Sequence, residues 1–485
     1  MKNKIVIILL TLLLIAAIAL FGFVYFNNKS DKSVSFVVNK NSNEGVKILV
    51  EGEPVEIRDN VITPITLTTV RPDTITIDDV TKEVKIKKLS KRNFVKVDIS
   101  YKDRTVNYLL KTLPDDFPEM NIENKARKKG YVITSFISKF ELHMKHPEYC
   151  AVVDMDGDTV YYRRNQEKIF NIYNMQKVIL PNKKVRYLLH VEIPNDQSGV
   201  EVGILGYQLV MDEKFRPIDK VTLLATAKHG PLLAEEHDML MLDDNHYIVL
   251  GKYAKDFTLA NSKKTKIIHN AIQEIKDGKV LFDWTSEDYP ELEKICYERS
   301  PELPIKDPDY MHINSLAIDP KDNNLVVSSA SGYYVAKIDR KTGEIIWILG
   351  GMQDQFNIPH SMIFVRQHHA HYLSNGKLAL FDNHRQFLSK IYKIAAVETG
   401  PSRILIFDLD EKNKKINSVK SIPLGTRIAV MGSIQELDDG GWFIGYGDSP
   451  RYSIKLIDKN WKTQWIMKVQ KPYVTYRAYY YKSLK

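Results

Sequence analysis

Short runs in which apolar and polar residues alternate fill most of this chain, and they predict β-strands rather than helices. The runs begin near Ser33 and continue almost to the C-terminus, with Asn, Gly, Asp and Pro residues between them. Such alternation places one face of each strand in a core, and the intervening residues favour turns. Asn375 and Gly376 separate two apolar runs, which is among the strongest short signals for a β-hairpin. The pattern therefore predicts an all-β protein.

The strands between residues 33 and 118 predict a small N-terminal β-sandwich. Their close spacing and turn-forming boundaries are typical of two packed antiparallel sheets. Pro114 and Pro118 flank an acidic pair, and two prolines this close together favour a stiff linker at the end of the domain. The predicted strands are VSFVV, GVKILV, ITPITLTTV, TITID, EVKIKKL, FVKVDISY and TVNYLL.

A longer repeat over residues 119–485 predicts a six-bladed β-propeller. A strand–turn–strand unit recurs about every 40–50 residues, a spacing typical of four-stranded sheets stacked around a central axis. Trp347, Trp442 and Trp465 occupy strand positions within these units, where we expect them to pack between blades. The clearest units are LVVSSAS with YYVAKIDRKTGEIIWILGG, KLALFDN with SRILIFDLDEKNKKI, and GWFIGYGD with YSIKLIDKNWKTQWIM.

Residues 1–32 predict a membrane anchor. The stretch Ile5–Phe26 carries no charge and is long enough to cross a bilayer core of ~30 Å as a helix. Two lysines precede it, and the bulky Phe21 and Phe23 stand where a signal peptide would have small residues for cleavage. We therefore expect an uncleaved single-pass anchor in the cell membrane, with the bulk of the chain outside the cytoplasm.

Charge and cysteine content exclude several classes of partner. The net charge of +9 is spread along the chain without a dense basic run, so we expect a solvated surface rather than a nucleic-acid interface. Cys150 and Cys296 are too few for a disulfide framework or a cysteine-rich metal site, although one disulfide between them stays open. No glycine-rich phosphate loop is present, so no nucleotide cofactor is expected. The sequence does not indicate an oligomeric state.

Three histidines at similar points of three strand units form the candidate chemical site. His237 precedes the run MLMLDDNHYIVL, His312 precedes SLAIDPKDNNLVVSS, and His368 begins the hairpin that contains Asn375 and Gly376. Inner strands of a propeller line one channel, so residues at their entrances converge even when they are far apart in sequence. Imidazole, with a pKa of about 6.5, can act near neutral pH as a nucleophile, an acid or a base.

With these motifs in order, the chain resembles the bacterial arylsulfate sulfotransferases. The resemblance extends from about Ser33 to Met467. It implies a six-bladed propeller preceded by a β-sandwich, export from the cytoplasm, and transfer of a sulfuryl group from a phenolic sulfate ester to a phenol without any cofactor. The matching text is EHDML, HINS, VVSS with VAKIDRKTGEIIWILGG, QHHA with NGKLALFDN, and GSIQEL with GGWFIGY.

The same resemblance assigns roles to individual residues. The first His of QHHA, His368, would be the nucleophile that becomes transiently sulfated. His312 and His237 would be the other catalytic residues, one of them acting as acid on the departing phenolate and as base on the incoming phenol. Asn314 would bind the substrate through its amide. Because adjacent residues of a strand face opposite ways, we expect only His368 of the pair, and not His369, to face the channel.

One position departs from the family pattern. Ala330 follows Ser328 and Ser329, where the pattern has an arginine that clamps the sulfate. Arg385 is therefore a candidate substrate-binding cation, and Arg427 is a second one. Two other interpretations stay open, namely a His-ligated zinc or copper enzyme and a non-catalytic propeller that binds a ligand or a protein at the cell surface. The acidic text around Gly157 is expected to form a hairpin turn rather than a calcium site.

Overall fold

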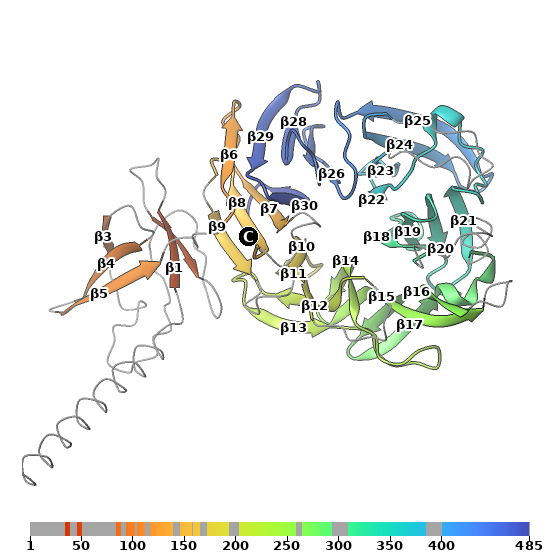
Figure 1. Ribbon diagram of the computed structural model, residues 1–485, viewed down its shortest axis with the longest axis horizontal. Helices are drawn as coiled ribbons and strands as arrows, with labels where there is room; N and C mark the ends of the chain where they lie inside the picture. The colour runs from red at the N-terminus through yellow and green to blue at the C-terminus, as the bar shows by residue number, and fades with distance from the viewer. Residues whose placement is uncertain are drawn as a thin grey trace, which may run out of the picture. The chain divides into compact units, whose positions relative to one another are not determined.

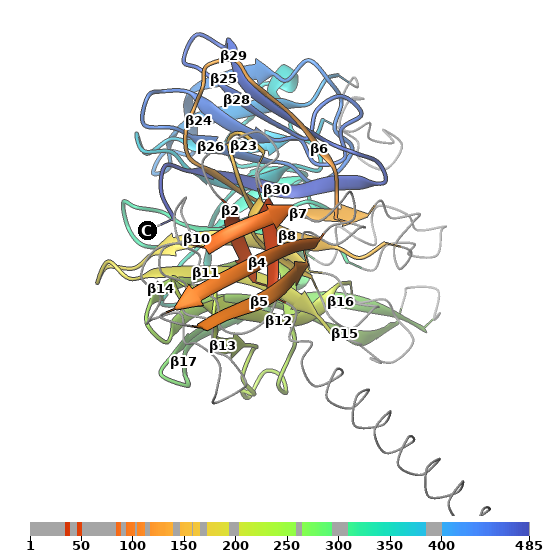
Figure 2. The ribbon, with the colours of Figure 1, turned by 90° about the vertical axis from the view of Figure 1, so that its left-hand side faces the viewer.

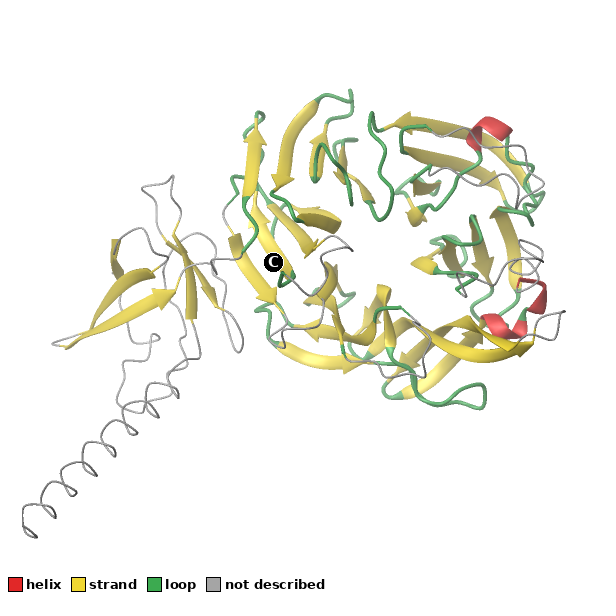
Figure 3. Ribbon diagram, viewed as in Figure 1, coloured by secondary structure: helices red, strands yellow, loops and turns green. Residues whose placement is uncertain are grey.

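The computed structural model divides the chain into two compact units, Met1–Asp115 and Asp116–Lys485. It describes five strands of the first unit and, in the second, residues 117–138, 146–157, 159–164, 172–193, 203–258, 264–292, 309–384 and 400–484. Strands account for almost all regular structure in these ranges (Figure 3). The two short 3-10 helices are η3 (Ser286–Asp288) and η4 (His360–Met362).

The first unit contains one five-stranded sheet with the order β2-β1-β5-β4-β3. Neighbouring strands are antiparallel except β1 and β5, which are parallel. All five strands fall on runs that the alternation predicts, whereas ITPITLTTV and TITID lie outside the described residues. The second layer of the sandwich thus stays a prediction. The strands are β1 (Val34–Val38), β2 (Val46–Val50), β3 (Val84–Lys88), β4 (Phe94–Tyr101) and β5 (Arg104–Lys111).

The predicted membrane anchor cannot be compared with the structure, because Ile5–Phe26 lies outside the described residues. Among the residues that are described, no helix is long and apolar enough to cross a membrane. Cys296 and Arg385 also fall outside the described ranges. Cys150 is buried and carries a free thiol.

The second unit is a propeller-like ring of antiparallel sheets around a central axis (Figure 1), which confirms the all-β, propeller-like fold. Three sheets follow one another along the ring. One is β18 (Ile313–Ile318), β19 (Leu325–Ser329), β20 (Tyr334–Ile338) and β21 (Ile345–Gly350). The next is β22 (His368–Tyr372), β23 (Leu378–Asp382), β24 (Arg403–Asp410) and β25 (Lys415–Pro423). The third contains β26 (Ser433–Glu436), β27 (Trp442–Gly445), β28 (Ile454–Ile457) and β29 (Thr463–Val469).

The largest sheet has eight strands, and its two halves are joined where β12 pairs with β14. Each half has four consecutive strands. The first half is β10 (Ile172–Ile179), β11 (Val185–Glu192), β12 (Leu205–Met211) and β13 (Pro217–Val221). The second is β14 (Ala234–Asp243), β15 (His246–Thr258), β16 (Lys264–Lys276) and β17 (Lys279–Thr285).

Strands from the two ends of the second unit close the ring. The C-terminal strand β30 (Tyr473–Tyr481) pairs with β7 (Tyr131–Ser138), in a sheet with β8 (Tyr149–Asp154) and β9 (Thr159–Arg164). The early strand β6 (Met120–Asn124) pairs with β29 (Figure 2). The ring is therefore closed by pairing between strands from the beginning and from the end of the second unit.

Apolar clusters between neighbouring sheets form the core. Trp347, Trp442 and Trp465 are all buried, as predicted from their strand positions. The Trp347 ring packs against residues of β23 and β24 in the next sheet, and the Trp465 Nε1–H donates to the Met155 carbonyl at 2.7 Å. The predicted hairpin is also present, since β22 pairs with β23 across Asn375 and Gly376, and Gly376 has a φ of 77°.

Candidate functional site

Irregular strands surround the axis of the ring. Strands β10, β14, β18, β22, β26 and β30 lie nearest the centre (Figure 1), and all except β26 have a register shift within the strand. Such bulges re-aim side chains and are common next to active sites. The residues within the shifts include Asn174, Glu235–Asp238, Asn314, His369 and Tyr476–Arg477.

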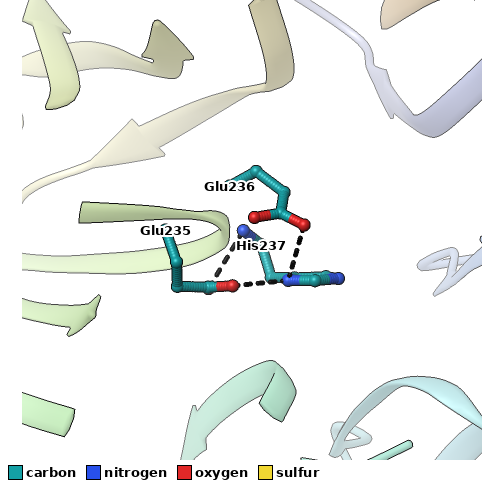
Figure 4. Close-up of side chains that lie close together, drawn as sticks. All are labelled: Glu235, Glu236 and His237. Carbon is teal, nitrogen blue, oxygen red and sulfur yellow. Dashed lines mark hydrogen bonds and ion pairs between the residues drawn. The ribbon is translucent and has the colours of Figure 1, made fainter. Parts of the chain in front are cut away.

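Two of the predicted histidines are each held by a carboxylate. His237 donates its Nδ1–H to Glu235 Oε2 at 2.6 Å, and Glu236 Oε1 lies 3.5 Å from the same nitrogen (Figure 4). His312 donates its Nδ1–H to Asp309 Oδ2 at 3.0 Å. A carboxylate accepts hydrogen bonds, so Nδ1 of each ring carries a proton and Nε2 is the nitrogen left to act on a substrate. The two ring centroids are 5.1 Å apart, so the structure brings these imidazoles together.

Lys252 connects the two carboxylates. Its side chain is 1% exposed, and its Nζ lies 3.2 Å from Asp309 Oδ2 and 3.6 Å from Glu235 Oε2. Burial alone would lower the pKa of the Lys252 ammonium, but Asp309, Glu236 and Glu235 raise it well above its ordinary value. Burial would likewise raise the pKa of Asp309, yet Lys252 and His312 hold that pKa well below its usual range. Lys252 therefore belongs to the site, although sequence reasoning did not select it.

The third predicted histidine, His368, is fixed by an amide rather than a carboxylate. Its Nδ1 lies 2.7 Å from Asn383 Oδ1 and 3.0 Å from the Arg366 carbonyl. The Asn383 amide nitrogen donates to two carbonyl groups, so its oxygen faces the imidazole and accepts the Nδ1 proton. His368 Nε2 accepts a hydrogen bond of 3.3 Å from the Met431 N–H. Burial lowers the pKa of His368 to about 3, with contributions from His237 and Arg477, although the Asn383 hydrogen bond opposes the shift.

His369 does not follow the alternation expected of a regular strand. It has a φ of 51° and lies in the register shift between His368 and His371. Its ring centroid is 4.6 Å from that of His371 and 5.8 Å from that of Tyr479, and its Nδ1 accepts from the Ile434 N–H at 3.2 Å. The bulge replaces the regular alternation at this point, so the argument from opposite strand faces does not apply to His369, and its half-buried ring packs against His371 and Tyr479.

Asn314 lies on the inner strand β18, and its amide nitrogen donates to the protein backbone. Asn314 is fully buried, and its Nδ2 donates to the Gln367 carbonyl at 2.7 Å. The Arg477 guanidinium donates to the Asn314 carbonyl at 2.5 Å and to Asp238 Oδ1 at 2.7 Å. One N–H of the Asn314 amide thus positions the segment that carries His368, and the buried Oδ1, which has no hydrogen-bond partner, can accept from a ligand.

Two cations that the sequence analysis did not select lie near the histidines. Arg385 lies outside the described residues, and Arg427 is exposed in the loop after β25. Ala330 is 2% exposed, and its N–H donates to the His312 carbonyl at 3.0 Å. Among the described residues, Arg477 and Lys252 are the cations that act on His237, and both have carboxylate partners.

Among the described residues, two groups of side chains have ligand atoms close enough to share a metal ion. One consists of Glu235, Glu236 and His237 (Figure 4), where Lys252 already approaches Glu235. The other consists of three outlying carboxylates, and the Lys337 ammonium lies within 2.7 Å of each of them. The carboxylates of this second group are Asp319, Asp322 and Glu411. Neither group contains two histidines.

Comparison with known families agrees with this arrangement. The profile of the arylsulfotransferase (ASST) family matches residues 119–481, which is most of the chain and nearly all of the ring. The chain belongs to the arylsulfotransferase family. Membership supports the transfer of sulfuryl groups as its general activity and small molecules as its substrates.

Solved structures are similar only at low identity. A periplasmic gluconolactonase of Pseudomonas aeruginosa is 9% identical with a TM-score of 0.37, and the match covers 72% of this chain and 99% of that one. A streptogramin B lyase is 9% identical with a TM-score of 0.31, over 73% of this chain and 89% of that one. Hydrazine synthase of Kuenenia stuttgartiensis is 13% identical with a TM-score of 0.33, over 65% and 74%. No curated protein matches the chain. Similarities of this size carry no functional argument.

Removing the Lys252 charge tests its link to the carboxylates. In Lys252→Met the buried Asp309 and Glu235 lose their cation, and breaking a buried ion pair this way typically costs ~3–5 kcal/mol. Lys252 and His312 hold the pKa of Asp309 low, so its contribution to stability is present at neutral pH and is lost as the pH falls. We therefore expect a stability deficit that is largest near neutral pH and shrinks on acidification.

Urea unfolding followed by tryptophan fluorescence at several pH values measures this deficit. Lys252→Arg keeps the charge and should lose much less stability. A deficit that does not change with pH would mean that Lys252 contributes by packing rather than by charge.

Proposed function

We propose that this chain transfers a sulfuryl group from a phenolic sulfate ester to a phenol through a sulfated His368. The observation that carries this proposal is the hydrogen bond from His368 Nδ1 to Asn383 Oδ1. It places the lone pair on Nε2, and burial keeps the imidazole neutral at physiological pH. A buried neutral imidazole with a fixed tautomer is what nucleophilic attack on a sulfuryl group requires. No nucleotide or other cofactor is needed.

The two half-reactions balance within the chain's own residues. His368 Nε2 forms a bond to sulfur while the S–O bond of the donor ester breaks, and the departing phenolate takes a proton from His312, which enters this half-reaction as the imidazolium held by Asp309. The acceptor phenol then gives its proton back to that imidazole. Its oxygen attacks the sulfur, and the S–N bond to His368 breaks. The weak hydrogen bond from the Met431 N–H to Nε2 must open during attack, which its length of 3.3 Å makes easy.

The architecture that we propose for this activity is a six-bladed propeller. The eight-stranded sheet divides into β10–β13 and β14–β17, and each half has the same number of consecutive strands as β18–β21. Counting each half as a blade gives six blades. The five-stranded sheet of the first unit would be one layer of the sandwich.

Substituting His368 tests the nucleophile. In His368→Asn the side-chain amide can still donate to Asn383 Oδ1, but the nucleophilic Nε2 is gone. We expect acceptor-dependent release of p-nitrophenol from p-nitrophenyl sulfate to fall roughly 10³-fold or more, as in other enzymes that lose a covalent nucleophile. Mass spectrometry of wild-type protein quenched at neutral pH, after incubation with donor alone, should find the sulfate on the peptide that holds His368.

His369→Asn is the matched control. Its amide oxygen can replace Nδ1 as the acceptor for the Ile434 N–H, so folding and most of the activity should be kept. Near-normal transfer by His368→Asn would overturn the proposed mechanism and favour a propeller that only binds ligands.

Asn383→Asp tests the neutral state of His368 through pH. A carboxylate in place of the amide stabilises the imidazolium, so it should raise the pKa of His368 from about 3. Because the neutral ring is the reactive form, the acid limb of the kcat/KM profile should move to higher pH by one or more units. Asn375→Asp, in the turn of the same hairpin, should leave the limb in place. An unmoved limb in folded Asn383→Asp would show that His368 ionisation does not control transfer.

We also propose that Ile5–Phe26 anchors the protein in the cell membrane, with the ring outside the cytoplasm. The proposal is supported by the uncharged length of this stretch and by the lack of a good cleavage site. The protein should sediment with membranes and resist extraction at alkaline pH. Recovery of a soluble, N-terminally processed form from wild-type cells would contradict it.

A further inference from the structure

Four buried polar atoms beside His237 have no hydrogen-bond partner. They are Tyr173 Oη, His190 Nε2, Glu236 Oε2 and Tyr476 Oη. Each of these residues is less than 9% exposed, and His190 is fully buried. Folded proteins rarely leave such groups unpaired, so a cluster of them calls for an explanation such as a bound polar group.

The four residues adjoin one another in space although they come from four strands. Tyr173 and His190 are opposite each other in the pairing of β10 with β11, and their ring centroids are 6.4 Å apart. The Tyr476 ring lies 5.5 Å from that of Tyr173 and 6.2 Å from that of His237. Glu236 Oε1 is 3.5 Å from His237 Nδ1. The unpaired atoms thus belong to one part of the wall, next to an imidazole of the site.

These atoms offer both donors and an acceptor. The Gln208 amide nitrogen donates to the Glu235 carbonyl at 2.8 Å and lies 3.4 Å from His190 Nδ1, so Nδ1 accepts and Nε2 carries the proton. Burial lowers the pKa of His190 to about 3, so this ring is a neutral donor. Glu236 Oε2 is an acceptor, and the two tyrosine hydroxyls can act either way. A hydroxyl group, which both donates and accepts, satisfies such a set.

The surroundings of these atoms suit an aromatic ring. Tyr173 and Tyr476 meet edge to face at 68° and pack with Ile137, Val474 and Met431. The backbone N–H of Met431 is the group that donates to His368 Nε2. One buried apolar and aromatic cluster therefore connects the unpaired polar atoms with the proposed nucleophile.

We propose that Tyr173, His190, Glu236 and Tyr476 form a polar subsite that binds a second hydroxyl group of the acceptor, so that dihydroxylated aromatic rings are preferred over simple phenols. The inference rests on the proposed function, since it names the acceptor class for that reaction. A ring held by its second hydroxyl presents its other hydroxyl to His237 and to the sulfated His368. Simple phenols leave the buried polar groups unpaired, and sites of this kind discriminate strongly against such analogues.

Acceptor pairs that differ in one hydrogen-bonding group measure this preference in the full-length protein. Resorcinol and hydroquinone are compared with phenol and with 3- and 4-methoxyphenol, using p-nitrophenyl sulfate as the donor. We expect kcat/KM for at least one diol to exceed that for phenol by roughly tenfold to a hundredfold, and the matching methoxyphenol to lose the gain. No preference for either diol would overturn the subsite and leave the four atoms to buried water.

Tyr173→Phe and Tyr476→Phe identify the groups responsible. Both keep the shape of the side chain, and both should reduce the diol-to-phenol ratio towards one while changing phenol turnover little. Tyr187→Phe is the control, because the Tyr187 hydroxyl is buried but donates to the Leu484 carbonyl, and its ratio should stay at the wild-type value. Equal losses for diol and phenol in Tyr173→Phe would show a merely structural role and overturn the proposal.

Binding without turnover separates this inference from the proposed reaction. Calorimetric titration of the unsulfated protein should show tighter binding of the preferred diol than of phenol, and Tyr173→Phe should remove the difference. If transfer is absent but this difference persists, the subsite stands and the sulfotransferase proposal fails. If transfer occurs without any difference in binding or in turnover, the subsite is overturned alone.

Discussion

A buried ion pair between Arg477 and Asp238 holds the centre of the ring together. The guanidinium is on β30, the strand that closes the ring, and the carboxylate is on β14. Arg477 also donates to a carbonyl of β18, and Asp238 accepts from the Leu316 N–H on that strand and from Asn174 on β10. Losing either charge would leave the other buried and unpaired, at a typical cost of ~3–5 kcal/mol. Ring closure and the placement of Asn314 and His237 therefore depend on the same pair.

The exclusion of water from this centre decides which protonation states are present. Burial lowers the pKa of His237, His368 and His369, so the neutral form of each of these imidazoles is favoured, as the proposed reaction requires of His368. The carboxylate and amide partners then decide which nitrogen carries the proton. Burial also makes each unpaired polar group costly, which is why the chain of contacts from His237 through Glu235, Lys252 and Asp309 to His312 is continuous.

Much of the fold could be predicted from the sequence, because strand alternation and turn residues are local signals. The Asn375–Gly376 hairpin, the burial of the tryptophans and the convergence of His237 with His312 follow from the alternation of the strands and from the place of each residue in its strand unit. The supporting residues do not, since Lys252 meets Asp309 and Asn383 meets His368 only through the tertiary fold, which no local pattern encodes. One signal was present, because Arg477 is the single charge of the aromatic strand YVTYRAYYY and Lys252 directly follows the apolar run YIVLG. A charge in such a position is buried only with a partner.

The charge balance of the centre bears on which anion it can hold. Arg477 and Lys252 both have carboxylate partners, and Ala330 adds no cation where the family pattern has an arginine. At Arg477 and Lys252, negative charge on a substrate would therefore meet cations that carboxylates already compensate. The desolvation cost of an ion rises steeply with its charge, so a dianion would lose far more than a monoanion on entering such a site. For the proposed reaction, compensation of these two cations favours an aryl sulfate, which carries one negative charge, over an aryl phosphate of the same shape, which carries close to two at neutral pH.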